Sequence, residues 1–230
     1  MKTLAIIPAR SGSKGITDKN IKHVGGRILL DWSIRQAQNA QLDIIVSTES
    51  QEYIDMINAM YPSKNYCPFQ RPKSLAKDDT PSNKVILHAL DWVEKNSNEK
   101  YDTLILLEPT SPLRLTSDIT IPIATMRDDE SIKSMVSVCA SHRAHPALSF
   151  RMNRGYLQPN TDIPHLRRQS LDPFYHLTGT IYLSNIEFYR AHKTFITPET
   201  KGYIIQDWQD FEIDAPDDII IVECFIKRVM

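Results

Sequence analysis

A short turn near the start of the chain carries the side chains best suited to binding an anion. It follows the apolar run 3–7 and holds the cations Arg10, Lys14 and Lys19 among two glycines and several hydroxyl groups. Glycines let a backbone fold tightly with its N–H groups turned inward, and cations beside such a nest attract phosphate. The turn matches neither GxGxxG nor GxxxxGK[ST]. It predicts a triphosphate site, with a solvated basic loop as the alternative.

A second chemical feature lies near the other end of the chain. Glu212 and Asp214 are two residues apart in the segment 211–214, which we expect to be a strand. Side chains two apart on a strand share a face, and Mg²⁺ prefers hard oxygen ligands together with shared phosphates. The alternative is a pair of solvated acids before a helix. The basic turn at the opposite end favours the metal site.

Composition narrows the class of protein. The 230 residues are enough for one large α/β domain or for one domain with a small appendage. They are 41% hydrophobic and 24% charged, with a net charge of −1, which is typical of a soluble globular protein. This balance argues against a broad nucleic-acid or membrane surface, and neither a signal-peptide apolar region nor a membrane-length apolar run is present. Three isolated cysteines indicate reduced thiols in the cytoplasm, and Cys139 is expected to be a small core residue. His142 and His145 lack a carboxylate partner, so zinc is not predicted.

The order of elements explains how the two chemical features meet. Strands and helices alternate at first, which predicts a mostly parallel sheet whose ligands bind beyond the carboxyl ends of its strands. Residues 61–80 are expected to form an ordered loop over the site, with Thr80 capping the next helix and Pro81 at its first position. Strands are predicted at 3–7, 42–48, 101–107, 134–139, 179–183, 204–205 and 211–214, and helices at 28–37, 48–60, from 80 or 81, 117–126, 185–191 and from 215.

The stretch 140–178 differs from its surroundings because histidines and arginines crowd it and apolar runs are few. We predict a hairpin there, with strands at 147–152 and 156–158 and a turn at 153–155. We expect this insertion to carry a dimer contact and cations for an acidic substrate. A nucleic-acid patch is the weaker alternative, because aromatic residues are sparse. Residues 1–230 are interpreted as one domain, with 140–178 as an insertion in it.

Ordered blocks along nearly the whole chain resemble the acylneuraminate cytidylyltransferases, also called CMP-sialic acid synthetases. The resemblance implies a Rossmann-like α/β nucleotidyltransferase with a protruding dimerisation element. It also implies a cytoplasmic homodimer that couples CTP to a nine-carbon 2-keto-3-deoxy sugar acid, such as N-acetylneuraminate or legionaminate, with Mg²⁺ or Mn²⁺. The matching blocks are 7–15, 19–20, 45–48, 71–72, 75–76, 79–80, 107–114, 168–169, 179–182 and 213–214.

The resemblance also implies roles for individual residues. Asp214, Arg10 and Lys19 would be catalytic, and Asp214 with Glu212 would hold the metal. The nucleotide would contact Arg10, Ser11, Gly12, Ser13, Lys14, Lys19, Asn20, Arg71, Ser82 and Glu108. The sugar acid would contact Glu108, Thr110, Ser111, Arg168, Gln169, His176 and Thr178. The nucleophile would be the sugar's anomeric hydroxyl, which agrees with the lack of a convincing nucleophile–base arrangement in the sequence.

Several positions depart from the family pattern, mostly on the sugar side. Glu212 stands where aspartate is usual, His176 where arginine is, and Thr178 where asparagine is. Glu108 occupies a position that is often glutamine, and the lysine expected just after the pair 145–146 is absent. CTP is therefore predicted more firmly than the acceptor, for which legionaminic acid is a candidate. The alternatives are a nucleotidyltransferase of other base or sugar specificity and a non-catalytic nucleotide-binding member.

Overall fold

The computed structural model describes residues 1–141, 145–159, 169 and 171–229. Its centre is a six-stranded sheet in the order β10-β6-β9-β5-β1-β4. Five strands run in one direction and β9 runs against its neighbours β5 and β6, so the prediction of a mostly parallel sheet is confirmed. The strands are β1 (Thr3–Pro8), β4 (Asp43–Ser47), β5 (Thr103–Leu106), β6 (Ser134–Ala140), β9 (Tyr175–Asn185) and β10 (Lys201–Ile204).

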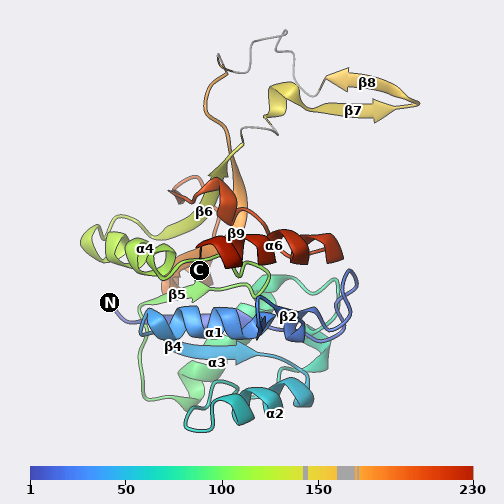
Figure 1. The fold of residues 1–230 in the computed structure, drawn as a ribbon. Helices are drawn as coiled ribbons and strands as arrows, with labels where there is room; N and C mark the ends of the chain where they lie inside the picture. Colours follow the sequence, from blue (N-terminus) through green and yellow to red (C-terminus); the bar gives the residue numbers. More distant parts are fainter. Residues whose placement is uncertain (142–144, 160–168, 170, 230) are drawn as a thin grey trace.

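Helices cover both faces of this sheet (Figure 1). They are α1 (Leu29–Asn39), α2 (Gln51–Met60), α3 (Ser82–Asn96), α4 (Thr116–Asp128), α5 (Ile186–His192) and α6 (Pro216–Val229). Single 3₁₀ turns occur at η1 (Lys19–Ile21), η2 (Lys73–Leu75), η3 (Pro146–Leu148) and η5 (Asp207–Gln209), and β2 (His23–Val24) with β3 (Arg27–Ile28) forms a small ribbon.

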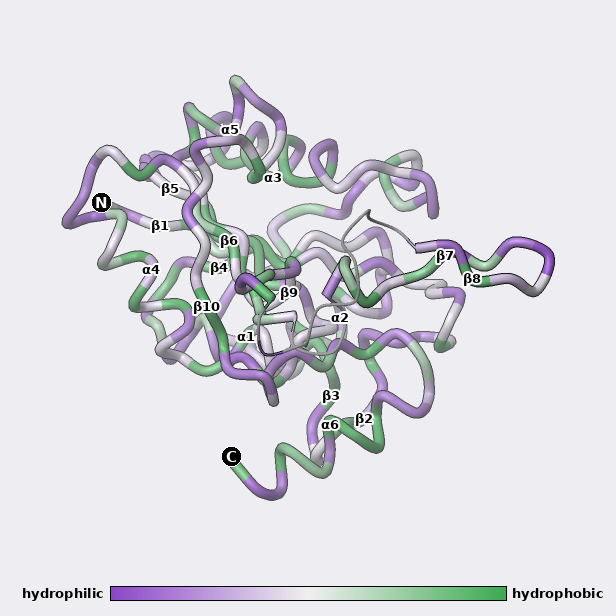
Figure 2. Tube along the Cα trace, turned by 90° about the horizontal axis from the view of Figure 1, so that it is seen from above, coloured by the Kyte–Doolittle hydropathy of each residue, from purple (hydrophilic) through white to green (hydrophobic). Residues whose placement is uncertain are grey.

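Successive side chains of β1 point to opposite faces of the sheet, so they belong to two separate layers of the core. Ala5 and Ile7 are fully buried with residues of α1, α2 and α4, whereas Leu4 and Ile6 are buried with residues of α3 and α5. Strands buried on both faces read as continuous apolar runs, which is why the sequence predicts these strands well. Figure 2 shows hydrophobic strands at the centre of the molecule and hydrophilic segments around them.

A third apolar cluster joins the two ends of the chain. Val24 and Leu29 pack with Leu113, Ile213 and Val222, so that α6 lies against the β2–β3 ribbon. This packing brings the segment before α6 beside the turn that follows β1. The sequence predicts α6 correctly but gives no direct sign of this contact.

The predicted hairpin is present as β7 (Phe150–Asn153) and β8 (Tyr156–Pro159). Arg154 and Gly155 take positive φ angles of 50° and 86°, as a tight two-residue hairpin turn requires. β6 and β9 extend from the body and lead to this hairpin, which protrudes from the molecule (Figure 1). We call β7, β8 and η3 the arm. Its role in dimerisation stays a prediction.

One predicted strand is absent, and one predicted helix start is wrong. Residues 211–214 are not a strand: the Ile213 N–H donates to the Thr110 carbonyl at 2.9 Å, and the Ile213 carbonyl accepts from Lys19 Nζ at 2.8 Å. These partners replace the ladder that a strand needs. α3 begins at Ser82, not at Thr80 or Pro81, because Pro81 has an extended ψ of 135° and serves as the cap.

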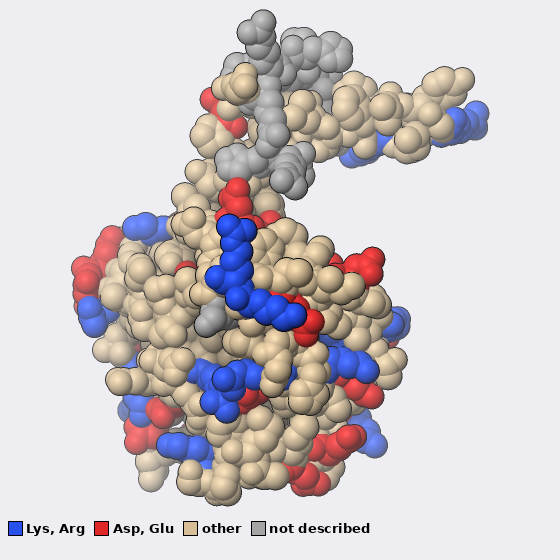
Figure 3. Space-filling view, in the orientation of Figure 1, with Lys and Arg blue, Asp and Glu red and all other residues tan. Residues whose placement is uncertain are grey.

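None of the three cysteines forms a disulfide bond. Cys67, Cys139 and Cys224 are all free, and Cys139 is buried on β6. In the part of the chain that the structure describes, no helix is both long and apolar enough to cross a bilayer. Cationic and anionic side chains are interspersed over the face shown in Figure 3.

Candidate active site

A cavity of about 570 Å³ opens beyond the carboxyl ends of β1 and β5. Residues that follow β1 form one wall, the stretch 71–86 forms another, and residues after β5 and before α6 form the rest. The predicted site residues on its surface are Arg10, Ser13, Lys14, Lys19, Asn20, Arg71, Ser82, Glu108, Thr110, Glu212 and Asp214. The two chemical features at opposite ends of the chain therefore meet in one space.

The turn after β1 is held tightly against the segment before α6. Lys19 Nζ donates to Asp214 Oδ1 at 2.8 Å and also to the carbonyl of Ile213. Gly15 lies so close to Asp214 that a Cβ there would overlap the Asp214 carbonyl oxygen. Asn20, which is 6% exposed, donates from Nδ2 to the Arg10 carbonyl at 2.8 Å and shapes the turn from within. These contacts hold the basic turn against Asp214.

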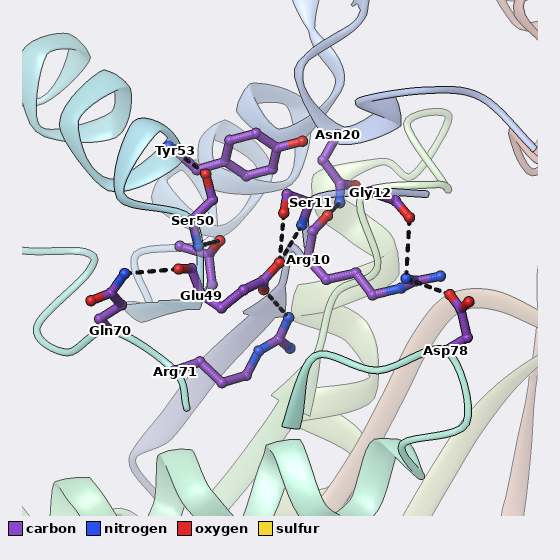
Figure 4. Close-up of polar contacts among 11 residues, drawn as sticks. Arg10, Ser11, Gly12, Asn20, Glu49, Ser50, Tyr53, Gln70, Arg71 and Asp78 are labelled. Carbon is purple, nitrogen blue, oxygen red and sulfur yellow. Dashed lines mark hydrogen bonds and ion pairs between the residues drawn. The ribbon is translucent and has the colours of Figure 1, made fainter. Parts of the chain in front are cut away.

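Asp78 joins the opposite wall of the cavity to the basic turn. Its carboxylate lies 2.7 Å from Arg10 Nη1 and 2.8 Å from Lys14 Nζ. Hydrogen bonding from Lys14, followed by the charge of Lys14 and the contact with Arg10, holds the pKa of Asp78 below its ordinary value. Figure 4 shows the Arg10 side chain directed toward Asp78. The loop containing Asp78 thus lies over the site, as the sequence predicts, and places a carboxylate on the cations expected to meet phosphate.

Glu49, just after β4, joins the basic turn to Arg71 (Figure 4). Its Oε1 accepts from both the N–H and the hydroxyl of Ser11 at 2.8 Å, and its Oε2 lies 2.7 Å from Arg71 Nη2. Burial alone would raise the pKa of Glu49, but the bonds from Arg71 and Ser11 outweigh it and hold that pKa below its ordinary value. Glu49 was not among the predicted site residues.

Arg71 is buried in the wall of the cavity with a donor to spare. Its side chain is 3% exposed, and its backbone N–H donates to the Thr48 carbonyl at 2.8 Å. Its buried Nε atom has no hydrogen-bond partner in the protein. A buried donor left unpaired is costly unless a ligand satisfies it, and Arg71 is one of the residues that line the cavity.

Two carboxylates, Glu108 and Glu212, lie on the floor of the cavity beside Gly179. The N–H of Gly179 donates to Glu212, and a Cβ on Gly179 would lie 2.7 Å from Glu212 and 2.9 Å from Glu108. Burial and the charge of Glu212 raise the pKa of Glu108 to about 7. Burial also raises the pKa of Glu212. The hydrogen bond from the Gly179 N–H opposes this rise, and the negative charge of Asp214 adds to it. Clustered acids of this kind favour a cation.

Arg114 supports this floor from below. It is 1% exposed and donates to the carbonyls of Glu108 at 3.0 Å and Gly179 at 3.4 Å, as well as to Thr180. Burial lowers the pKa of Arg114 to about 10, although the charge of Glu108 opposes the shift. A bulge between β6 and β9 at Val136 and Val138 sets the backbone here. Arg114 lies in a block that the resemblance includes, but the resemblance implies no role for it.

Among the described residues, four further predicted ones lie off the cavity wall: Ser11, Gly12, Ser111 and Gln169. Ser11 is bound to Glu49, and Gly12 takes a φ of 66° in the turn. Ser111 is buried beside Gly179 with an unpartnered hydroxyl. Gln169 is exposed, and Arg168 lies outside the described residues.

His176 and Thr178 are occupied by the chain's own groups. The two His176 ring nitrogens lie 2.6 Å from Ser141 Oγ and 2.6 Å from Asp210 Oδ2. Thr178 is 2% exposed and donates to Ser137 Oγ at 2.8 Å within the bulge. Neither residue lines the cavity, so their contact with an acceptor stays a prediction.

A mostly parallel α/β sheet with a cationic, glycine-containing turn at the mouth of a cavity defines a nucleotide-binding domain. The model of the family described as "Cytidylyltransferase" matches residues 4–218. The chain therefore belongs to the cytidylyltransferase family. Its fold is shared with a solved CMP:2-keto-3-deoxy-manno-octonic acid synthetase complexed with CTP, at a TM-score of 0.69, 16% identity and full coverage of both chains.

Two curated relatives cover almost all of the chain. An N-acylneuraminate cytidylyltransferase of Streptococcus agalactiae is 30% identical over 96% of this chain and 52% of its own length. A CMP-N,N'-diacetyllegionaminic acid synthase of Legionella pneumophila is 29% identical over 97% of this chain and 95% of its own length. The chain thus spans about half the length of the streptococcal relative and nearly all of the Legionella one.

Proposed function

We propose that the chain transfers CMP from CTP to a nine-carbon 2-keto-3-deoxy sugar acid and releases pyrophosphate. One observation carries the proposal: in a member of the cytidylyltransferase family, cations after β1 and carboxylates before α6 line the same cavity. A nucleoside triphosphate brings about four negative charges, and phosphoryl transfer depends mainly on neutralising and positioning them. The cavity supplies groups of both kinds.

The cations would bind the triphosphate. Arg10 and Lys14 reach the cavity from the turn, and their partner Asp78 sits where an incoming phosphate would compete for them. Lys19 remains against Asp214 and bridges the two walls. Arg71 would donate its free Nε to the nucleotide, with Ser82 at the start of α3 nearby on the cavity wall.

The acceptor would supply the nucleophile from its anomeric hydroxyl. Its oxygen bonds to the α-phosphorus, the bond to the bridging β-phosphate oxygen breaks, and pyrophosphate leaves. We assign the released proton to Asp214, whose side chain is 77% exposed while Glu108 and Glu212 are half-buried. Glu108 and Thr110, which line the same cavity, would contact the sugar.

Asp214 and Glu212 would hold Mg²⁺ or Mn²⁺. Their donor set fits, because both offer carboxylate oxygens and because the repulsion around Gly179 is relieved by a cation. When bound, the metal would neutralise charge on the triphosphate. The residues themselves orient the segment 212–214 through the Gly179 N–H and the bond from Lys19.

The acceptor class follows from the relatives rather than from the cavity alone. The streptococcal and Legionella proteins are named for an N-acylneuraminate and a diacetyllegionaminate. The departures at His176 and Thr178 favour a legionaminate-type acid over N-acetylneuraminate. We also propose that the chain acts as a homodimer in the cytoplasm, where CTP is made. The exposed apolar residues Phe150, Met152 and Tyr156 on the arm support the dimer.

Pyrophosphate release with each of the four nucleoside triphosphates tests the proposal. Each is mixed with N-acetylneuraminate, a legionaminate and an eight-carbon keto-deoxy acid, with Mg²⁺ present. We expect release with CTP and a nine-carbon acid only. Release with another nucleotide would support a different base specificity, and CTP binding in calorimetry without transfer to any acid would support a non-catalytic nucleotide-binding protein. Either result overturns the proposed function.

A further inference from the structure

Three side chains with different donor atoms meet at the root of the arm, apart from the cavity. Cys139 on β6 and His176 on β9 are direct cross-strand neighbours, and directly opposed side chains in such a pair project to the same side. Asp210 follows η5 and reaches the same place. The thiol, ring nitrogen and carboxylate oxygen all lie within 4.8 Å of one another.

The ring of His176 is held in place at both of its nitrogens. Its Nε2 lies 2.6 Å from Asp210 Oδ2, and its Nδ1 lies 2.6 Å from Ser141 Oγ. A metal-bound histidine has its second ring nitrogen held by a hydrogen-bonding neighbour that fixes the ring. Ser141, which is 7% exposed, takes that place here.

We propose that Cys139, His176 and Asp210 bind a divalent cation of the zinc class, with water completing a tetrahedral site. A set of sulfur, nitrogen and oxygen donors suits a borderline-soft ion and does not suit Mg²⁺, which prefers oxygen throughout. This site is therefore chemically distinct from the carboxylates at Glu212 and Asp214, and it does not depend on the proposed reaction.

The surroundings suit a positive charge that replaces the thiol proton. Cys139 is 2% exposed, and its Sγ lies 3.7 Å from Asp207 Oδ1. Burial and the charges of Asp210 and Asp207 raise the pKa of the Cys139 thiol to about 11. The ion would join three segments distant in sequence at the point where β6 and β9 leave the body (Figure 1).

Titration of the full chain with Co²⁺, in excess Mg²⁺, tests the site. Tetrahedral cobalt with a thiolate ligand gives visible bands and a sulfur-to-metal charge-transfer band. We expect one equivalent to bind with both signals, and one equivalent of Zn²⁺ to remove them. Ser141→Ala should weaken binding roughly 10- to 100-fold, as loss of an orienting partner does.

Matched variants identify the ligands. Cys139→Ser should abolish the charge-transfer band, whereas Cys224→Ser, which changes the exposed cysteine, should keep it. Asp214→Asn should also keep it. If Cys139→Ser does not fold, His176→Gln provides the test. The His176 side chain is 40% exposed, and this variant must lose the band. No stoichiometric binding, a band that survives Cys139→Ser or His176→Gln, or a band lost in Cys224→Ser or Asp214→Asn overturns the proposal.

Discussion

Replacing Glu49 by glutamine tests whether the buried pair with Arg71 holds the cavity together. The two side chains are 10% and 3% exposed, so solvent screens the pair little. Glutamine keeps an oxygen for Ser11 but leaves the Arg71 cation without its counter-charge. Removing one partner of a buried pair costs about 3–5 kcal/mol. We take about 3 kcal/mol, because the second Arg71 contact, from its backbone to Thr48, remains.

Urea unfolding and thermal melting measure this loss. In a chain of this length about 3 kcal/mol corresponds to a fall in Tm of roughly 6–12 °C. Glu52→Gln on α2 is the control, because Glu52 is exposed and should change stability by less than about 0.5 kcal/mol. In a double-mutant cycle, Glu49→Gln with Arg71→Gln should cost less than the sum of the two changes. A Glu49→Gln protein as stable as Glu52→Gln, or strictly additive changes, would refute the role of the pair.

The same pair predicts a dependence on pH. Folding holds the pKa of Glu49 below its ordinary value of 4.5, so the folded protein binds this proton less readily than the unfolded chain. The stabilisation from Glu49 is therefore complete above pH 4.5 and is lost as the pH falls through the lowered pKa. The stability gap between the wild-type protein and Glu49→Gln should be constant between pH 6 and 7 and should narrow below pH 4.5. A gap that widens on acidification would contradict the ionised pair.

Further predictions concern the proposed reaction. Arg10→Ala should weaken CTP binding about tenfold or more in calorimetry, since a charged hydrogen bond contributes about 1.5–3 kcal/mol; unchanged affinity would place the triphosphate elsewhere. Asp214→Ala should lower kcat far more than CTP affinity, and unaltered Mg²⁺ dependence of that variant would contradict the metal assignment. Gly179→Ala should lower activity and stability together, because its methyl group would clash with Glu212 and Glu108. A variant with the activity and stability of the wild-type protein would show that the two side chains move aside without cost.

The sequence predicts the strands and the basic turn well, because the signal for each lies within a few neighbouring residues. Continuous apolar runs identify buried strands, and Arg154 with Gly155 gives the hairpin turn its shape. The error at 211–214 has a tertiary cause: Thr110 and Lys19 supply the hydrogen bonds that a strand partner would have supplied. The spacing of apolar residues within one segment does not show a hydrogen-bond partner that lies a hundred residues away in the sequence.

Some residues of the candidate site could also be predicted from the sequence, and others could not. Cations and acids recognisable by type were placed correctly on the cavity, but Glu49 was missed because an acid after a strand is ordinary until Ser11 and Arg71 are seen beside it. Thr178 is predicted to contact an acceptor, and in the structure its hydroxyl donates to Ser137 beside the bulge at Val136 and Val138, so that contact stays a prediction. Orientation at a bulge depends on register, which the sequence alone does not show.

Mass spectrometry of the product tests the central claim most directly. The protein is incubated with CTP, Mg²⁺ and a mixture of nine-carbon 2-keto-3-deoxy sugar acids. The account predicts a conjugate whose mass equals one acid plus CMP less one water, together with equimolar pyrophosphate. CTP that remains intact with every acid, or CMP released without any conjugate, would contradict it.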